Sequence, residues 1–248
     1  MNMFPSVHLP APHEKLPLDH PRLRQAHRLY FVLTNHCNYS CPWCSMYSSP
    51  AGNTWMKLED YRRVIGGHGD CEIQLEGGEP TLHPQIGEFL RLGREYGGCR
   101  RLIVCTNGSV LPRNKAGLTA WLESLGEDCV LKLSVNHYLM ERDAGLLQLA
   151  VLARDIFEER GGRRMLVVNV RIRRDVEEDD ARVVEAVRQA GLMPHANIFH
   201  LRRYGLASPQ TNWEAPVWAG YNFTMVNPDG RLFGPDFVAS SEAMRELP

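Results

Sequence analysis

The sequence predicts an α/β fold built on a parallel sheet. Six short apolar runs with the character of buried strands alternate with segments in which apolar residues recur at helical spacing. An alternation of this kind implies right-handed crossovers between parallel neighbours. The 248 residues suffice for one domain of barrel size, and either an open doubly wound sheet or a partial barrel would satisfy the pattern.

The expected elements follow one another in a regular order. Strands are expected at residues 28–34, 72–76, 101–106, 130–135, 164–171 and 195–201. Helices are expected between them, at residues 57–65, 86–90, 118–125, 146–157 and 176–187. Because α/β proteins build their sites at the carboxyl ends of parallel strands, the loops that follow these strands are expected to carry the function.

The two ends of the chain depart from this alternation. Residues 1–27 hold five prolines and four histidines in a weakly apolar stretch, which indicates an extended N-terminal arm. The main domain is expected to cover residues 28–205, and residues 206–248 are expected to form a C-terminal capping extension. Within that extension, residues 221–237 are expected to contain a β-hairpin.

Composition argues against several classes of partner. With 28 basic and 29 acidic side chains, the net charge of −1 gives no basic surface for nucleic acid or for an anionic membrane. No run approaches the roughly 18 apolar residues of a membrane span. The cysteines show no disulfide pattern and no targeting segment is recognised, so we expect a cytoplasmic protein.

Three cysteines, Cys37, Cys41 and Cys44, lie close together after the first expected strand. Thiolates select zinc or iron–sulfur centres, and a closed structural zinc site normally needs four ligands. Three soft ligands with one open coordination position therefore favour an iron–sulfur cluster, with zinc as the alternative. The remaining cysteines stand singly in apolar runs and are expected to be small buried hydrophobes: Cys71, Cys99, Cys105 and Cys129.

Polar motifs also follow the later strands. Residues 77–80 read Gly-Gly-Glu-Pro after the second strand, and residues 106–108 read Thr-Asn-Gly after the third. The fourth strand ends in Ser134-Val135-Asn136-His137, and Asn169 lies within the fifth. Taken singly, these are ordinary turn or strand residues. Their regular placement favours one shared site at the carboxyl ends of the strands.

The spacing Cys37-x3-Cys41-x2-Cys44, followed one strand later by Gly-Gly-Glu-Pro at residues 77–80, resembles the radical S-adenosylmethionine (SAM) superfamily. The resemblance extends in element order from residue 28 to residue 205. It implies a partial (β/α)6 TIM-like barrel with a short C-terminal extension containing a β-hairpin, and so favours the barrel over the open sheet.

The resemblance also implies the cofactors and their contacts. One 4Fe–4S cluster would be held by the three cysteines, and its open iron would bind SAM. An electron from a flavodoxin or ferredoxin-type donor would then cleave SAM to methionine and a 5'-deoxyadenosyl radical. Glu79 would accept hydrogen bonds from the methionyl ammonium, with Gly77 and Gly78 allowing close approach. The other expected SAM contacts are Trp43, Pro80, Asn107, Ser134, Asn136, Arg142 and Asn169.

Some of these contacts have expected roles. Ser134 and Asn136 would hydrogen-bond the ribose, and Trp43 would lie near the adenine. Arg142 would neutralise the SAM carboxylate, although an arginine on a helix surface is more often simply solvated.

Two further residues are candidates for substrate contact. His137, just past the ribose motif, would serve as a proton donor or polar contact, with plain packing as the alternative. Arg171 would hold a phosphate or carboxylate of the substrate, together with Arg202 and Arg203.

The C-terminal extension resembles the start of an auxiliary-cluster (SPASM or twitch-like) domain, but the chain has no cysteine after Cys129. We interpret it as a cysteine-free remnant that caps the barrel mouth. Trp213, Trp218 and Tyr221 are candidates for the pocket lining, or else pack the extension onto the barrel.

The expected function is that of a radical SAM enzyme of oxidoreductase, lyase or isomerase type. It would abstract hydrogen from a small-molecule substrate, such as a sugar, nucleoside or amino acid, in a biosynthetic step. Peptide modification and glycyl-radical activation are alternatives. Glycyl-radical activation is the less favoured of the two. Activating enzymes of that kind usually carry an Asp-x-Lys motif at the fourth strand, where this chain has Leu131-Lys132-Leu133-Ser134. The alternative of another class is a non-catalytic Fe–S redox sensor or scaffold. The substitution Glu79→Ala would lower the SAM affinity of an enzyme but would leave such a sensor unaffected.

Overall fold

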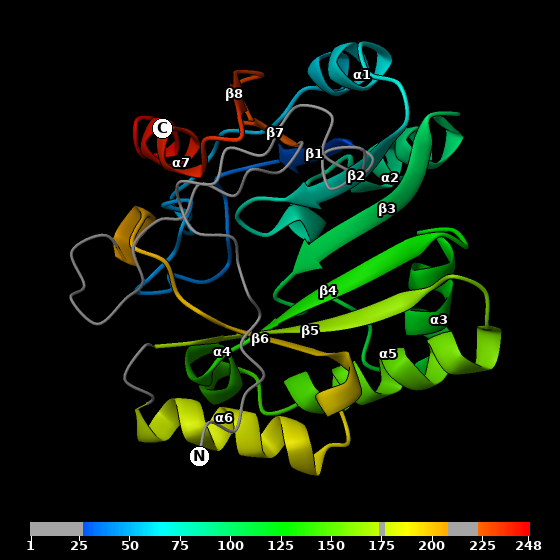
Figure 1. The fold of residues 1–248 in the computed structure, drawn as a ribbon, viewed down its shortest axis with the longest axis vertical. Helices are drawn as coiled ribbons and strands as arrows, with labels where there is room; N and C mark the ends of the chain where they lie inside the picture. The colour runs from blue at the N-terminus through cyan, green and yellow to red at the C-terminus, as the bar shows by residue number, and fades with distance from the viewer. Residues whose placement is uncertain (1–26, 174–176, 208–222) are drawn as a thin grey trace, which may run out of the picture.

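The computed structural model describes residues 27–173, 177–207 and 223–248, and these form one eight-stranded sheet with flanking helices (Figure 1). Six strands follow the chain in order, and each pairs in parallel with the next. They are β1 (His27–Val32), β2 (Cys71–Glu76), β3 (Cys99–Thr106), β4 (Cys129–Val135), β5 (Met165–Ile172) and β6 (Ala196–His200). The sequential order produces a curved, unclosed sheet, and the expected partial barrel is confirmed.

The C-terminal extension continues this sheet at its first strand. β7 (Phe223–Val226) pairs in parallel with β1, and β8 (Leu232–Gly234) runs antiparallel to β7. The predicted hairpin is therefore present in the described part of the extension. Its strands follow β1 in the order β1-β7-β8, so the hairpin widens the barrel wall.

The helices that connect the parallel strands pack on the outer face of the sheet (Figure 1). The longer ones are α1 (Leu58–Gly66), α2 (Ile86–Glu95), α3 (Lys115–Glu123), α5 (Leu146–Arg160) and α6 (Glu178–Gln189). The described chain also forms a short helix, α4 (His137–Arg142), and the 3₁₀ turns η2 (Pro80–Leu82), η3 (Met193–His195) and η4 (Gly205–Ala207). α7 (Phe237–Arg245) lies next to β7 and β8.

Alternation along the strands divides the sheet into two chemically different faces. In β5, Leu166, Val168 and Val170 are buried and belong to the main core, whereas Asn169 and Arg171 are only partly buried. Successive side chains of a strand point to opposite faces, so the apolar set faces the helices and the polar set faces the barrel interior. The interior is consequently available for a polar site.

The sequence predictions for the main domain are largely confirmed. All six expected strands are present, as are the five expected helices, with shifted ends. The helices α4 and α7 were not predicted from the sequence. In both, a side chain before the first residue provides a cap: Asn136 Oδ1 accepts from Leu139 N–H at 3.0 Å, and Asp236 Oδ1 accepts from Ala239 N–H at 2.9 Å.

Parts of two predictions fall outside the described residues, namely residues 1–26 of the expected arm and the lining candidates Trp213, Trp218 and Tyr221. In the part of the chain that the structure describes, no helix combines the length and the apolar character needed to cross a bilayer.

Candidate active site

A cavity of about 340 Å³ lies at the carboxyl ends of the strands, and most of the predicted site residues line it. All three cysteines of the predicted cluster loop are on its wall, as are the two glycines at positions 77 and 78. The predicted contacts on the wall also include Trp43, Asn107, Ser134, Asn136 and Asn169. The parallel topology thus brings together side chains that are far apart in the sequence.

The cysteine loop between β1 and α1 is fixed by local hydrogen bonds. The Cys44 N–H donates to the carbonyl of Cys41 at 3.1 Å, which closes a turn. Two N–H groups also approach sulfur atoms. Ser48 N–H donates to Cys44 Sγ at 3.4 Å, and Asn107 Nδ2 donates to Cys37 Sγ at 3.8 Å. Hydrogen bonds to cluster sulfurs are among the factors that set a cluster's reduction potential.

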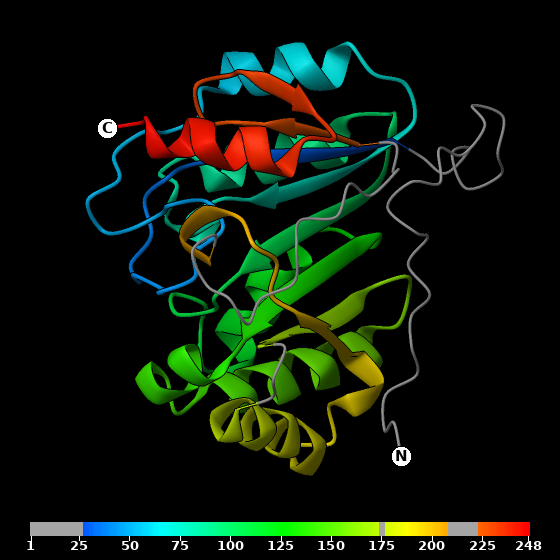
Figure 2. The same cartoon turned by 60° about the vertical axis from the view of Figure 1, so that its left-hand side comes forward.

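C-terminal elements brace this loop from the side, as Figure 2 shows for α7 and the blue segment after β1. Tyr47 OH donates to Glu242 of α7 at 3.0 Å, and Leu206 N–H donates to the carbonyl of Cys44 at 2.9 Å. Gly205 has a φ of +64°, and a Cβ there would lie 2.5 Å from the Cys44 carbonyl oxygen. Glycine at position 205 therefore lets η4 approach the loop.

The two glycines after β2 serve the same close packing. A Cβ on Gly78 would lie only 2.0 Å from the carbonyl oxygen of His36, and Gly77 has a φ of +139°. Gly78 N–H donates to the carbonyl of Thr34 at 2.7 Å. Both residues thus allow the end of β2 to lie directly against the cysteine loop, while their backbone also lines the cavity.

The three thiols suit a cluster. Among the described residues, no three His, Cys, Asp or Glu side chains converge on a position for a single metal ion. A 4Fe–4S cluster makes a different demand, because each thiolate binds a different iron atom and the cluster lies between them. Burial raises the pKa of Cys37 and of Cys41 to about 12, so a cationic iron centre would be needed to hold both as thiolates. Cys37, Cys41 and Cys44 all line one cavity.

Glu79 has partners other than the predicted ammonium. The side chain is fully buried and does not line the cavity. Its Oε1 accepts from Thr106 Oγ1 at 2.6 Å and from both donors of Thr81, and its Oε2 accepts from Asn107 N–H at 2.7 Å. Pro80 is also buried away from the cavity wall, at the start of η2. In this structure, Glu79 joins the second and third strand-end motifs.

The predicted ribose contacts lie on one wall of the cavity. Ser134 and Asn169 are register partners on β4 and β5, so their side chains share the inner face. Asn169 Oδ1 accepts from Asn197 Nδ2 at 3.3 Å. Asn136 uses its Oδ1 to cap α4, which leaves its Nδ2 to the cavity. Hydroxyl and amide groups are therefore present where the resemblance predicts them.

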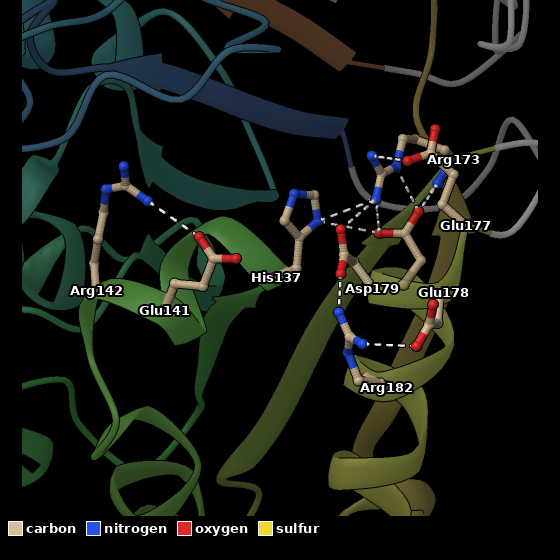
Figure 3. Close-up of polar contacts among 9 residues, drawn as sticks. His137, Glu141, Arg142, Arg173, Glu177, Glu178, Asp179 and Arg182 are labelled. Atoms are coloured by element: carbon tan, nitrogen blue, oxygen red, sulfur yellow. Dashed lines mark hydrogen bonds and ion pairs between the residues drawn. The ribbon is translucent and has the colours of Figure 1, made fainter.

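His137 is outside the cavity wall and belongs to a buried ion-pair network (Figure 3). His137 Nδ1 lies 3.2 Å from Asp180 Oδ1, and Asp180 also accepts from Arg173 N–H at 2.7 Å and Nε at 2.9 Å. The His137 ring packs on Trp43, with ring centroids 4.9 Å apart. His137 therefore contacts Trp43, which lines the cavity, but does not line the cavity itself.

Arg142 likewise does not reach the cavity wall. Its guanidinium stacks 3.4 Å from the ring centroid of Tyr138, and its Nη1 donates to the Tyr138 carbonyl at 3.1 Å. Figure 3 shows Arg142 extended beside Glu141, away from the His137 network. The surface alternative given for Arg142 describes this conformation better than the predicted SAM contact.

Sequence reasoning missed a second group of cavity residues, which lies deeper on the inner face. These residues are Tyr30, Gln74, Glu76, Cys105, Lys132 and Asn197. Lys132 Nζ donates to Gln74 Oε1 at 2.8 Å, and Gln74 Nε2 donates to Glu76. Cys105 was expected to be a plain core residue, and the structure corrects this by placing it on the cavity wall. Polar residues at every second position of β2 and β4 were the available signal.

Aromatic side chains line another part of the wall. Phe199, Tyr204 and Phe237 come from β6, the segment after it and α7. Arg171 also lines the cavity, whereas Arg202 and Arg203 are not on its wall. The site therefore combines a thiol end, a polar inner face and an aromatic edge.

No protein-family model matches the chain. Its sequence relatives include GTP 3',8-cyclases. That of Stenotrophomonas maltophilia (strain K279a) is 28% identical over 131 residues, which are 48% of this chain and 40% of that protein. That of Cronobacter sakazakii is 33% identical over 109 residues, covering 39% of this chain and 33% of that protein. The chain thus spans at most about two fifths of the length of these relatives.

Solved structures share the fold. Streptococcus suis SuiB matches with a TM-score of 0.57 at 13% identity, over 85% of this chain and 60% of that one. SuiB bound to its precursor peptide SuiA matches with a TM-score of 0.56 at 13% identity, over 90% of this chain and 61% of that one. The strand-end motifs, the cavity that they line, and these likenesses in sequence and fold support the resemblance of the chain to the radical SAM superfamily.

Proposed function

We propose that this chain is an enzyme that uses SAM and one 4Fe–4S cluster to abstract hydrogen from a small-molecule substrate. When bound, the cluster would supply the electron that cleaves SAM to methionine and a 5'-deoxyadenosyl radical. One observation carries the proposal: Cys37, Cys41 and Cys44 share a single cavity with the polar groups of the later strand-end motifs.

The residues of this cavity support the proposal through the groups that they leave available. Within the described part of the chain, the Ser134 hydroxyl makes no side-chain hydrogen bond, so it remains available to a ribose hydroxyl. Asn136 is 5% exposed and presents its amide nitrogen from the cap of α4. Trp43 offers an apolar indole face beside these groups. Preorganised polar groups of this kind would orient SAM beside the thiols.

The volume of the cavity supports a small substrate. A space of about 340 Å³ lies near the lower end of the range for small-molecule sites. Sugars, nucleosides and amino acids all remain candidates. The relatives act on GTP by their name, which adds nucleotides to the compounds worth testing. A flavodoxin or ferredoxin-type protein is proposed as the electron donor.

Deuterium transfer tests the proposal directly. Reconstituted protein would be incubated without oxygen with SAM, dithionite and deuterated sugars, nucleosides, GTP or amino acids in turn. The proposal predicts that 5'-deoxyadenosine acquires deuterium from one of these compounds. Formation of 5'-deoxyadenosine that never depends on a small molecule, but depends on an added peptide or protein, would contradict the proposed substrate class.

Ser134→Ala separates the enzyme from a sensor or scaffold. Because Glu79 joins the loops after β2 and β3, Glu79→Ala would destabilise an enzyme and a sensor alike. Substitution of Ser134 therefore distinguishes the two better. An enzyme should lose SAM affinity in the Ser134→Ala variant, by roughly fivefold for one lost hydrogen bond. A sensor that does not bind SAM would show no SAM binding in either protein.

A further inference from the structure

The inner face of the sheet carries charged side chains beyond the predicted SAM contacts. Lys132 pairs in register with Cys105 on β3 and with Val167 on β5, and Arg171 pairs with Phe199 on β6. Because side chains alternate along a strand, Lys132 shares the inner face with Ser134, and Arg171 shares it with Asn169. Lys132 and Arg171 both line the cavity.

Positive charge exceeds negative charge on this wall. Among the residues that line the cavity, Lys132 and Arg171 are the cations and Glu76 is the acid. Lys132 Nζ donates to the neutral amide of Gln74 at 2.8 Å, and the same amide donates to Glu76. Gln74 therefore lies between the lysine and the carboxylate. Lys132 makes no ion pair within the described part of the chain.

Arg171 is short of partners. Its Nε is buried and has no hydrogen-bond partner among the described residues, and its guanidinium lies 5.4 Å from the ring centroid of Phe199. Arg28, which lies on β1 and on the same face of the sheet as Arg171, is instead paired with Glu72. The Glu76 carboxylate interacts with Arg171 electrostatically but makes no ion pair with it among the described residues. A partly buried guanidinium with an unpartnered donor costs free energy, which a bound anion would offset. Arginine binds carboxylate and phosphate groups particularly well because its donors form a planar fork.

We propose that Arg171 and Lys132 bind an anionic group, a carboxylate or a phosphate, of the small substrate. This inference rests on the proposed function and adds to it the chemical class of the substrate. The strand-end residues would hold SAM, and the anionic group would bind to Lys132 of β4 and Arg171 of β5 on the inner face. One charged end held by two cations would fix the rest of the molecule relative to the SAM-binding end.

The test measures anion binding on the reconstituted, SAM-bound protein by calorimetry without oxygen. The probes are inorganic phosphate, succinate and, as an uncharged control, glycerol. The variants are Arg171→Gln and Lys132→Gln. Arg100→Gln, at the exposed end of β3, is the matched control, because Arg100 lies on the same sheet but outside the cavity. Iron content and melting temperature are recorded for every protein.

The proposal predicts that phosphate or succinate binds to the wild type and to Arg100→Gln, and that glycerol does not. Each cavity variant should weaken that binding on the order of tenfold, the usual effect of losing a hydrogen bond to a charged group. Binding of phosphate alone would assign a phosphate, and binding of succinate alone a carboxylate. Failure of both anions to bind, or equal binding in all four proteins, would overturn the proposal.

Affinity for SAM and release of 5'-deoxyadenosine are measured on the same samples. If Arg171→Gln lowers SAM affinity and leaves anion binding intact, Arg171 serves the SAM carboxylate and the proposal is wrong. If the wild type binds the anions but never releases 5'-deoxyadenosine, the proposed radical chemistry fails while the anion site remains. The two failures are therefore distinguishable.

Discussion

The backbone N–H of Asn107 donates to Oε2 of Glu79 at 2.7 Å, and this hydrogen bond joins the motifs that follow β2 and β3. The side chain of Asn107 extends the connection to the cysteine loop. Its Nδ2 lies 3.8 Å from Cys37 Sγ and 3.0 Å from Asn38 Oδ1. Three strand ends are thus connected through one buried carboxylate and one amide.

Glu79→Gln should destabilise the protein and reduce its iron content. The glutamine keeps the shape of the side chain but removes the charge and replaces one acceptor oxygen by a donor, which leaves the N–H of Asn107 or the hydroxyl of Thr106 without an acceptor. We expect a loss of roughly 3 kcal/mol in the free energy of unfolding. Glu95→Gln, whose side chain is 58% exposed on α2, is the control and should be nearly neutral. Urea unfolding without oxygen measures both, and equal stability of the two variants would contradict this role of Glu79.

Gly78→Ala should prevent assembly of the cysteine loop. A Cβ at this position would lie 2.0 Å from the His36 carbonyl oxygen, a distance that only a backbone shift can relieve. Gly87→Ala is the matched control, because a Cβ there meets no atom within 4 Å and alanine favours the helix by about 1 kcal/mol. Iron and sulfide content after reconstitution checks the pair. Normal iron loading of Gly78→Ala would show that the close approach is not required.

Glu76→Gln should change how stability depends on pH. Burial raises the pKa of Glu76 above its ordinary 4.5, while Gln74 and Lys132 partly oppose the rise. The folded protein therefore keeps this proton to a higher pH than the unfolded chain does. The resulting stabilisation is fully present below pH 4.5 and is lost as pH rises through the raised pKa. Melting temperatures across this range should fall less steeply in Glu76→Gln than in the wild type, and parallel curves would contradict the account.

Asp180→Asn should loosen the support behind Trp43. The Asp180 carboxylate is 2% exposed and accepts from three donors of Arg173 as well as facing His137. Breaking such a buried network typically costs roughly 3 kcal/mol. Asp179→Asn, on the same helix but more exposed (Figure 3), should cost less than about 1 kcal/mol. Chemical denaturation measures the free energy of unfolding of both variants. A small effect of Asp180→Asn would show that the network is not needed for the fold.

The sequence pattern was sufficient for the six parallel strands and for the position of the cavity, whereas the sequential strand order of a partial barrel followed from the family resemblance. Short apolar runs at regular intervals have few interpretations other than buried parallel strands, and the carboxyl ends of such strands share one edge. The short helix α4 was missed because its six residues are too few to show helical periodicity. The pairing of β7 with β1 joins segments from opposite ends of the described chain, and no local pattern encodes such contacts.

The site itself was predicted only in part. Backbone motifs such as the cysteine loop and residues 77–78 are recognisable because their spacing reflects geometry. The direction of an individual side chain cannot be read from such a motif. Glu79, His137 and Arg142 were predicted as contacts, but they do not line the cavity. Lys132 and Gln74 were overlooked because a polar residue inside a strand is informative only once the face that it occupies is known.

Cluster-dependent cleavage of SAM tests the central claim most directly. Protein reconstituted with iron and sulfide would be incubated without oxygen with dithionite and SAM, and 5'-deoxyadenosine would be followed by chromatography in the wild type and in Cys41→Ala. The account predicts 5'-deoxyadenosine from the wild type alone. An intact cluster in the wild type that neither binds SAM nor releases 5'-deoxyadenosine would contradict it.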